Sequence, residues 1–245
     1  MGSRSKRRRR LEIVYLLEAA PLFGGVKVVL HQANLLADRG HAVTIACPSK
    51  PPDWYPLRAR WLRTVGLEPG EIPRADLLIA TFWTTLPRAL AADKGRVVHF
   101  CQGFEGDLDH NRAEHPAILE AYSRPVPALT VSPHLAEMIQ RRFGRPALAV
   151  PQLLGPAWRP AFRLRPRRPA RILATGPWEI YLKGVPVAAD AVLELRRRGL
   201  DCTYVRLSQW PLCEEERAHL VPDEFHHRVP PDAVPELVRS CDLLL

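Results

Sequence analysis

The sequence has no apolar run that approaches the roughly 18 residues of a membrane-spanning helix. The basic residues at its start are followed by an apolar stretch that Glu12 and Glu18 interrupt, without a small-residue cleavage site. This pattern is not that of a secretory signal peptide. We therefore predict a cytoplasmic protein.

The closely spaced cysteine pairs of zinc sites and the glycine-rich GxGxxG motif of dinucleotide-binding proteins are also missing. The five cysteines are an odd number and show no CxxC spacing. Several of them, such as Cys47 in VTIACP, lie within apolar runs, which is typical of buried free thiols in a reducing compartment. A zinc site is therefore not predicted. Because GxGxxG does not occur, a dinucleotide-binding fold of the dehydrogenase kind is not supported either.

Positive charge is abundant but is concentrated in two segments. The formal net charge is +9, yet residues 1–10 contain six Lys and Arg and residues 159–171 contain six Arg, with no acidic residue in either segment. Without these twelve charges, the rest of the chain has a net charge of −3. It is therefore not basic, which argues against a nucleic-acid-binding face. The first segment is predicted to be a disordered tail or a contact with an anionic membrane surface, and the second a solvated linker.

Short apolar runs alternate with helical patterns in the first part of the chain. Residues 11–17 are rich in β-branched and aromatic side chains, as in a buried strand, and apolar residues recur at helical spacing from Val26 to Ala37. The Pro-rich stretch up to Pro73 predicts a loop with at most one short helix. Further strands are predicted at 41–48, 75–82, 96–103, 127–132 and 147–153, with a helix at 133–144.

The alternation begins again after the Pro/Arg-rich segment, with strands at 201–208, 224–229 and 241–245 and a short helix at 231–240. Strands that alternate with helices predict an α/β fold with parallel sheets. We predict two Rossmann-like, doubly wound domains, 11–158 and 170–245, with a basic tail at 1–10 and a linker at 159–169. Because the second pattern ends on an apolar strand, we expect this domain to be incomplete and the chain to be truncated.

Two strand-to-helix loops contain residues suited to a phosphate group. Gly24 and Gly25 precede the first predicted helix, where glycine lets the backbone approach a ligand and the helix N-terminus favours negative charge. A tight turn explains this pair equally well. In the second loop, Lys183 and Gly184 precede a helix whose first residue is predicted to be Pro186. Lys183 would add a positive charge beside that N-terminus, although a solvated lysine at a turn is the simpler interpretation.

The helix after the second loop is predicted from its spacing and its end. Three arginines, 196–198, would offset the helix dipole before Gly199 ends the helix. Its buried face is predicted to consist of Val187, Ala188, Ala191, Val192 and Leu195.

Several segments together resemble the retaining, nucleotide-sugar-dependent glycosyltransferases of family 4. GGVKVVLHQANLLADRGHAVTIACP is similar to the opening of that family, a glycine pair and long helix followed by L-A-x-x-G-H-x-V-T. ALTVSPHLAEMIQRRFG and VPQLLGPAWRP are similar to the late strand, helix and crossover of its first domain. ATGPWEIYLKGVPVAADAVLELRRRG is similar to the opening unit of its donor domain, and VPPDAVPELVRSCDLLL to the helix and strand before its acidic donor motif. The resemblance covers residues 11–245.

This resemblance implies a GT-B architecture, in which two facing Rossmann-like domains bind an acceptor and a nucleotide sugar. It implies transfer of a hexose or deoxyhexose, without a cofactor or metal ion, from a nucleotide-diphosphate sugar to a glycan or lipid-linked acceptor of cell-envelope polysaccharide biosynthesis. By position, Gly24 and Gly25 would lie near the donor phosphate and the acceptor, and Gly176, Lys183 and Gly184 would hold the diphosphate. Fixed cations would stabilise the charge on the departing diphosphate in an oxocarbenium-like transition state.

Two positions depart from the family pattern. Where the family often has Gly-Arg before the Lys-Gly pair, Gly176 is followed by Pro-Trp, which puts one phosphate contact in doubt. Where many members end a strand in a histidine near the reacting sugar, this sequence has Gln102, with His99 three residues earlier. Members that act on rhamnose-type donors can show a glutamine and a nearby acid, so Gln102 and Glu105 are the candidate catalytic residues. A surface-loop acid is the alternative for Glu105.

Other functions remain open. The family's pair of glutamates would follow Leu245 and is not in this sequence, so a non-catalytic nucleotide-sugar-binding or scaffold protein is the main alternative. Asp107 and Asp109 form a DxD triplet that could hold Mg²⁺ or Mn²⁺ against a diphosphate in a metal-dependent transferase, but a polar loop explains this short motif more simply. A nucleic-acid-binding protein would rest on the two arginine-rich segments alone.

Overall fold

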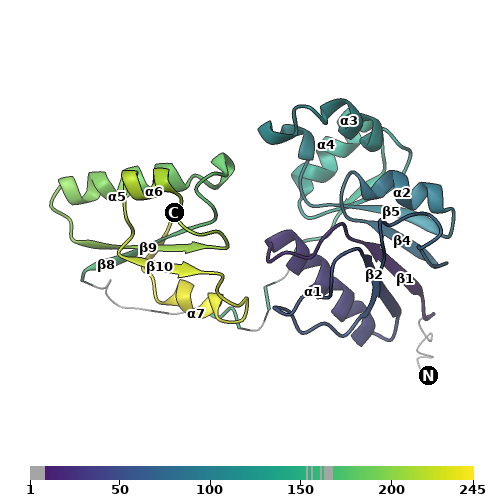
Figure 1. Ribbon diagram of the computed structural model, residues 1–245, viewed down its shortest axis with the longest axis horizontal. Helices are drawn as coiled ribbons and strands as arrows, with labels where there is room; N and C mark the ends of the chain where they lie inside the picture. The colour runs from purple at the N-terminus through teal and green to yellow at the C-terminus, as the bar shows by residue number, and fades with distance from the viewer. Residues whose placement is uncertain (1–8, 153, 156, 161, 163–167) are drawn as a thin grey trace, which may run out of the picture. The chain divides into compact units, whose positions relative to one another are not determined.

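The computed structural model describes residues 9–152, 154–155, 157–160, 162 and 168–245. The chain divides into two compact units, Met1–Leu153 and Leu154–Leu245 (Figure 1). Much of the predicted tail and linker, residues 1–8, 161 and 163–167, lies outside the described residues, and the predicted domain limits stay a prediction. No helix in the described part of the chain is long and apolar enough to cross a membrane.

The first unit contains a seven-stranded parallel sheet in the order β3-β2-β1-β4-β5-β6-β7. Its strands are β1 (Glu12–Leu16), β2 (Ala42–Cys47), β3 (Arg60–Arg63), β4 (Leu77–Ala80), β5 (Arg96–Cys101), β6 (Ala128–Thr130) and β7 (Ala147–Ala149). The chain builds outward from β1 to β3 and then returns to the other side of β1 with β4. In doubly wound sheets ligands bind at such a reversal, beside the carboxyl ends of the strands.

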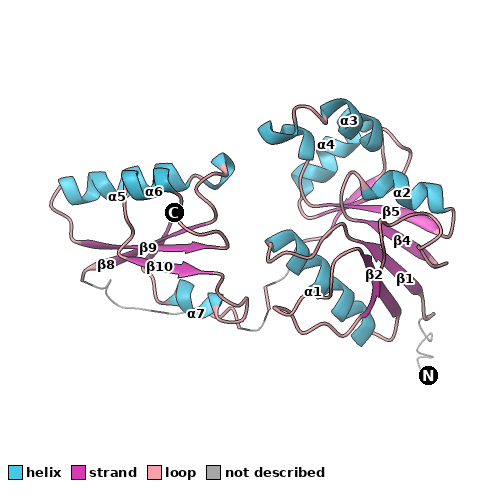
Figure 2. Cartoon of the chain, in the orientation of Figure 1, coloured by secondary structure: helices cyan, strands magenta, loops and turns pink. Residues whose placement is uncertain are grey.

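Helices cover both faces of this sheet (Figure 2). They are α1 (Gly24–Asp38), α2 (Thr85–Ala92), α3 (His115–Tyr122) and α4 (Pro133–Phe143). Helix α1 packs on the face that contains Ile13 and Tyr15, and α2 packs on the opposite face, against Val14 and Leu16. Successive residues of a strand point to opposite faces, so a strand buried on both faces is apolar throughout. This explains why residues 13–17 form a continuous apolar run.

The second unit contains a four-stranded parallel sheet in the order β10-β9-β8-β11. Its elements are β8 (Ala170–Thr175), α5 (Val185–Arg197), β9 (Cys202–Ser208), α6 (Glu214–His219), β10 (Glu224–His227), α7 (Val234–Arg239) and β11 (Leu243–Leu244). Helix α5 packs against Ile172 and Tyr204 on one face, and α7 packs against Leu173 and Val205 on the other. The strand order reverses between β8 and β11. The predicted α/β fold with two doubly wound parallel sheets is confirmed.

Two local predictions were wrong. The Pro-rich stretch contains β3 rather than a short helix. Because β3 is an edge strand that pairs with β2 alone and has Arg60 and Arg63 at its ends, it lacks the apolar signal of the central strands. In α5, Val187 and Ala191 are exposed. The helix begins one residue before Pro186, and its buried face follows the spacing of that first residue: Val185, Ala188, Ala189 and Val192.

Asn34 of α1 connects that helix to the segment before β3. The side chain is buried; its oxygen accepts from the backbone N–H of Arg58 at 2.7 Å and of Ala59 at 3.3 Å, and its nitrogen donates to the carbonyl of Pro56 at 2.9 Å. We expect Asn34→Ala to lower the free energy of unfolding by about 2 kcal/mol, because the loop loses these partners. Urea unfolding measures this change. Asp38→Ala, which removes an exposed ion pair with Arg58, is the matched control and should have little effect; equal losses would contradict the assignment.

Candidate functional site

The loops after β1 and β4 meet at the reversal of the first sheet. The carboxylate of Glu18, which follows β1, accepts a hydrogen bond from the hydroxyl of Thr84, which follows β4. The buried hydroxyl of Thr81 donates to the carbonyl of Leu16 at 2.7 Å and joins the same two strand ends. These contacts place a half-buried carboxylate and hydroxyl where ligands of doubly wound sheets bind. Glu18 and Thr84 were not predicted as site residues.

Gln102, which follows β5, lies over the start of α1. Its amide nitrogen donates to the carbonyl of Gly25 at 3.0 Å. A Cβ atom added to Gly25 would lie 3.4 Å from that nitrogen, so the carboxamide rests directly on the glycine. Gly24 is the first residue of α1, and its Cβ position faces open space. The structure thus brings together Gln102 and the glycine pair, which are far apart in the sequence.

The side chain of Glu105 points to α3. It is 9% exposed, so the alternative of a surface-loop acid is wrong, and its Oε2 lies 2.5 Å from the hydroxyl of Tyr122. Burial raises the pKa of Glu105, with the hydrogen bond from Tyr122 acting against this shift. The hydroxyl of Tyr122 also lies 3.0 Å from the carbonyl of Gly103.

This arrangement supports the loop that contains Gln102. Glu105 hydrogen-bonds to Tyr122 and not, within the described residues, to Gln102. Its predicted catalytic contact therefore stays a prediction, while its support of the loop follows from the geometry.

His99 lies inside β5 and is fully buried. Its Nδ1 lies 3.3 Å from the guanidinium of Arg145, and its Nε2 is without a hydrogen-bond partner among the described residues. Burial, with a smaller contribution from Arg145, lowers the pKa of His99 to about 3. His99 is therefore a neutral core residue rather than a substitute for the family's catalytic histidine.

The DxD triplet lies on an exposed turn. Asp109 forms an ion pair with Arg112 at 2.9 Å, and both side chains are at least 80% exposed. No group of three or more His, Cys, Asp or Glu is placed to hold a metal ion in the ranges that the structure describes. The geometry thus gives no support to a metal site at Asp107 and Asp109; the expectation of a metal-independent reaction stays a prediction.

The second candidate site follows β8, at the reversal of the second sheet. Gly176 has a φ of +110°, which disfavours other residues, and a Cβ atom there would lie 2.8 Å from Cγ of Lys183. The aliphatic part of Lys183 therefore rests on Gly176. Gly184 is the N-cap of α5, whose first N–H groups have no partner within the helix. Lys183 is exposed and forms no ion pair with any described residue, so its charge is available to an anion.

Arg206 and Glu216 were also not predicted as site residues. They form a fully buried ion pair beneath the Gly176 turn, with 2.6 Å between Nε and Oε1. A charged residue in the otherwise uncharged CTYVRLS of β9 was the available sequence signal. Its partner could not be inferred, because Glu216 lies in EEERAH, which reads as a solvated segment.

No family model matches the chain, and no curated protein matches it. Solved structures match its fold. Starch synthase IV from Arabidopsis thaliana, bound to ADP and acarbose, matches with a TM-score of 0.61 and 13% identity over 96% of this chain and 78% of the other. Anabaena HepE, in complex with UDP and glucose, matches with a TM-score of 0.65 and 10% identity; the match covers 96% of this chain and 73% of HepE. WaaG, a glycosyltransferase involved in lipopolysaccharide biosynthesis, matches with a TM-score of 0.63 and 14% identity; the match covers 95% of this chain and 74% of WaaG.

These structures are GT-B glycosyltransferases, so the chain has the predicted GT-B type of α/β fold. Identities this low show the fold alone, because one fold hosts many functions. Membership of family 4 and retention of configuration are not shown by them.

The depressed pKa of His99 makes stability depend on pH. In the unfolded chain a histidine binds a proton below about pH 6.5, whereas in the folded protein His99 binds one only near pH 3. The wild type should therefore lose about 2 kcal/mol relative to His99→Gln between pH 6.5 and pH 5, because the unfolded state binds the additional proton. Urea unfolding of both proteins at these pH values measures the difference. A difference that does not change with pH would show that His99 takes up its proton in the folded protein as readily as in the unfolded chain, and would contradict the lowered pKa.

Proposed function

We propose that this protein is a glycosyltransferase that moves a sugar from a nucleotide-diphosphate sugar to a hydroxyl group of an acceptor. The observation that carries this proposal is the loop after β8. There, the aliphatic stem of Lys183, which forms no ion pair with any described residue, rests on Gly176, and Gly184 follows as the N-cap of α5. Solved structures with the same fold hold ADP or UDP, which supports a nucleoside diphosphate as the ligand.

The chemistry of this loop suits a departing diphosphate. The first N–H groups of α5 and the positive end of its dipole favour an anion, and the ammonium of Lys183 adds a full charge. When the bond between sugar and diphosphate breaks, negative charge accumulates on the diphosphate. Groups that are already fixed in place stabilise this charge without reorganising, and thereby lower the barrier.

The loops of the first sheet suit an acceptor. Glu18, Thr84 and Gln102 offer a carboxylate, a hydroxyl and a carboxamide at neighbouring strand ends. Such groups can orient the hydroxyls of a sugar. A protein that only binds nucleotide sugars would not need them, so this gathering favours the enzyme over the non-catalytic alternative.

The finer assignments rest on the resemblance in sequence. We propose a retaining family 4 enzyme that transfers a hexose or deoxyhexose without a metal ion, with a glycan or lipid-linked acceptor of cell-envelope polysaccharide biosynthesis. We also propose that it acts in the cytoplasm, with the basic residues 1–10 on an anionic membrane surface.

Nucleotide binding tests the donor site. We expect calorimetric titration with UDP and with ADP to detect binding of at least one of them, and Lys183→Met to weaken that binding at least tenfold, because a charge-assisted contact to the diphosphate is lost. Arg198→Met, which removes an exposed cation at the other end of α5, is the control and should leave the affinity unchanged. Absence of binding to both nucleotides, or equal affinities in wild type and Lys183→Met, would refute the proposed site.

Turnover tests the transferase itself. Incubation with a panel of UDP-, ADP-, GDP- and dTDP-sugars and hydroxyl-bearing acceptors should release the nucleoside diphosphate from one donor class in the wild type. Lys183→Met should release it much more slowly, and Arg198→Met at the wild-type rate. Binding without turnover over the whole panel would favour the non-catalytic alternative.

A further inference from the structure

The guanidinium of Arg206 connects β9 to the end of β8. Arg206 is 0% exposed, and each of its three guanidinium nitrogens donates to a protein acceptor. Nε donates to Glu216 at 2.6 Å, Nη1 to the carbonyl of Ala174 at 2.9 Å, and Nη2 to the carbonyl of Gly176 at 2.8 Å. One side chain thus holds two carbonyls at the point where β8 ends and the candidate diphosphate loop begins.

These contacts fix Gly176 from two sides. Its N–H donates to the carbonyl of Leu207 at 2.9 Å, and its carbonyl accepts from Arg206. With both groups held, neither the peptide unit before Gly176 nor the one after it can rotate without losing a hydrogen bond. Because the stem of Lys183 rests on Gly176, the orientation of these two peptide units determines the surface on which the lysine lies.

A buried ion pair is not a strong source of stability. Removing two charges from water costs several kcal/mol per ion, and apolar side chains of similar volume often replace such a pair without loss. Arg206 and Glu216 are therefore more important for the position of the carbonyls that they hold than for stability. Glu216, on α6, is 2% exposed and orients the guanidinium so that its two Nη groups face the carbonyls.

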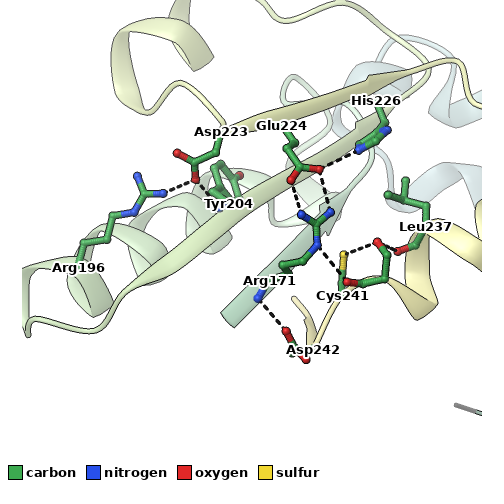
Figure 3. Close-up of polar contacts among 10 residues, drawn as sticks. Arg171, Arg196, Tyr204, Asp223, Glu224, His226, Leu237, Cys241 and Asp242 are labelled. Carbon is green, nitrogen blue, oxygen red and sulfur yellow. Dashed lines mark hydrogen bonds and ion pairs between the residues drawn. The ribbon is translucent and has the colours of Figure 1, made fainter. Parts of the chain in front are cut away.

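A second Arg–Glu pair in the same sheet provides a comparison. Arg171, near the start of β8, donates through both Nη groups to Glu224, at 2.8 Å for Nη2, and through Nε to the carbonyl of Ser240 (Figure 3). This pair is partly exposed, and its hydrogen bonds go to the start of β10 and the end of α7 rather than to residues 176–184. It therefore shares the chemistry of the Arg206 pair but not its connection to the loop.

We propose that Arg206, oriented by Glu216, is a positioning residue of the diphosphate loop: it holds the Gly176 carbonyl so that Lys183 lies beside the N-terminus of α5. The assignment rests on the proposed function, because it names the group that prepares the donor site. Arg206 does not touch the diphosphate itself, since its donors are directed to Glu216 and to the carbonyls of the β8 end.

The test removes the hydrogen bonds without leaving a buried charge. In the double variant Arg206→Met/Glu216→Leu we expect the Kd for UDP or ADP, whichever binds the wild type, to rise about tenfold, while the unfolding midpoint stays close to that of the wild type. Amide hydrogen exchange of residues 176–184 should accelerate, because this loop loses its anchor. The matched control Arg171→Met/Glu224→Leu should change neither the Kd nor the exchange of these residues.

A conservative variant gives a second, independent comparison. Arg206→Lys keeps a positive charge for Glu216, but one ammonium cannot reproduce the planar fork that reaches both carbonyls. We therefore expect it to fold, to accelerate exchange in residues 176–184 and to raise the Kd as the double variant does. This variant decides the question if the double variant does not fold.

The outcomes separate this proposal from the proposed function. An unchanged Kd, or unchanged exchange in residues 176–184, in a folded Arg206 variant would overturn the positioning role. If the wild type binds neither UDP nor ADP, the donor site is refuted, and the exchange measurement alone decides whether Arg206 anchors the loop: faster exchange supports the anchor, and unchanged exchange refutes it.

Discussion

A parallel sheet brings the carboxyl ends of all its strands to one edge, and the candidate sites of this protein depend on that constraint. In each unit the chain builds outward from its first strand and later returns to that strand's other side, with β4 beside β1 and β11 beside β8. At this reversal the loops diverge toward opposite faces, which leaves space for a ligand. The loop with the glycine pair follows β1, and the loop with Lys183 follows β8, so both lie at such a reversal.

Polar side chains beneath these edges fix the loops. Thr81 binds the carbonyl that ends β1, Glu105 and Tyr122 support the turn after β5, and Arg206 binds the carbonyls that end β8. A polar group in an apolar interior needs a partner, and a strand end offers carbonyls that no neighbouring strand uses. The same hydrogen bonds that satisfy these buried groups therefore hold the loops in one conformation.

The sequence predicted what depends on local pattern and missed what depends on distant partners. Apolar runs predicted the central strands, and the Lys-Gly pair before a helix predicted the loop after β8. Residues 60–63 were missed because an edge strand pairs on one side and keeps polar ends. The contact of Gln102 with Gly25, like the pairing of Arg206 with Glu216, joins separate elements. Nothing in the sequence near Gln102 or Arg206 indicates which distant residue it contacts, so these contacts are seen only in the folded chain.

The loop after β8 has one cation, Lys183, where the glycosyltransferases that the sequence resembles often have two. Proline and tryptophan follow Gly176 in place of the arginine; Pro177 is buried, and the ring of Trp178 lies 5.3 Å from that of His219 on α6. These residues anchor the loop by packing instead of supplying charge. An ammonium on a flexible stem positions a diphosphate less well than a planar guanidinium does. With Lys183 as the cation of this loop, its placement on Gly176 matters more, and so does the buried arginine that holds that glycine.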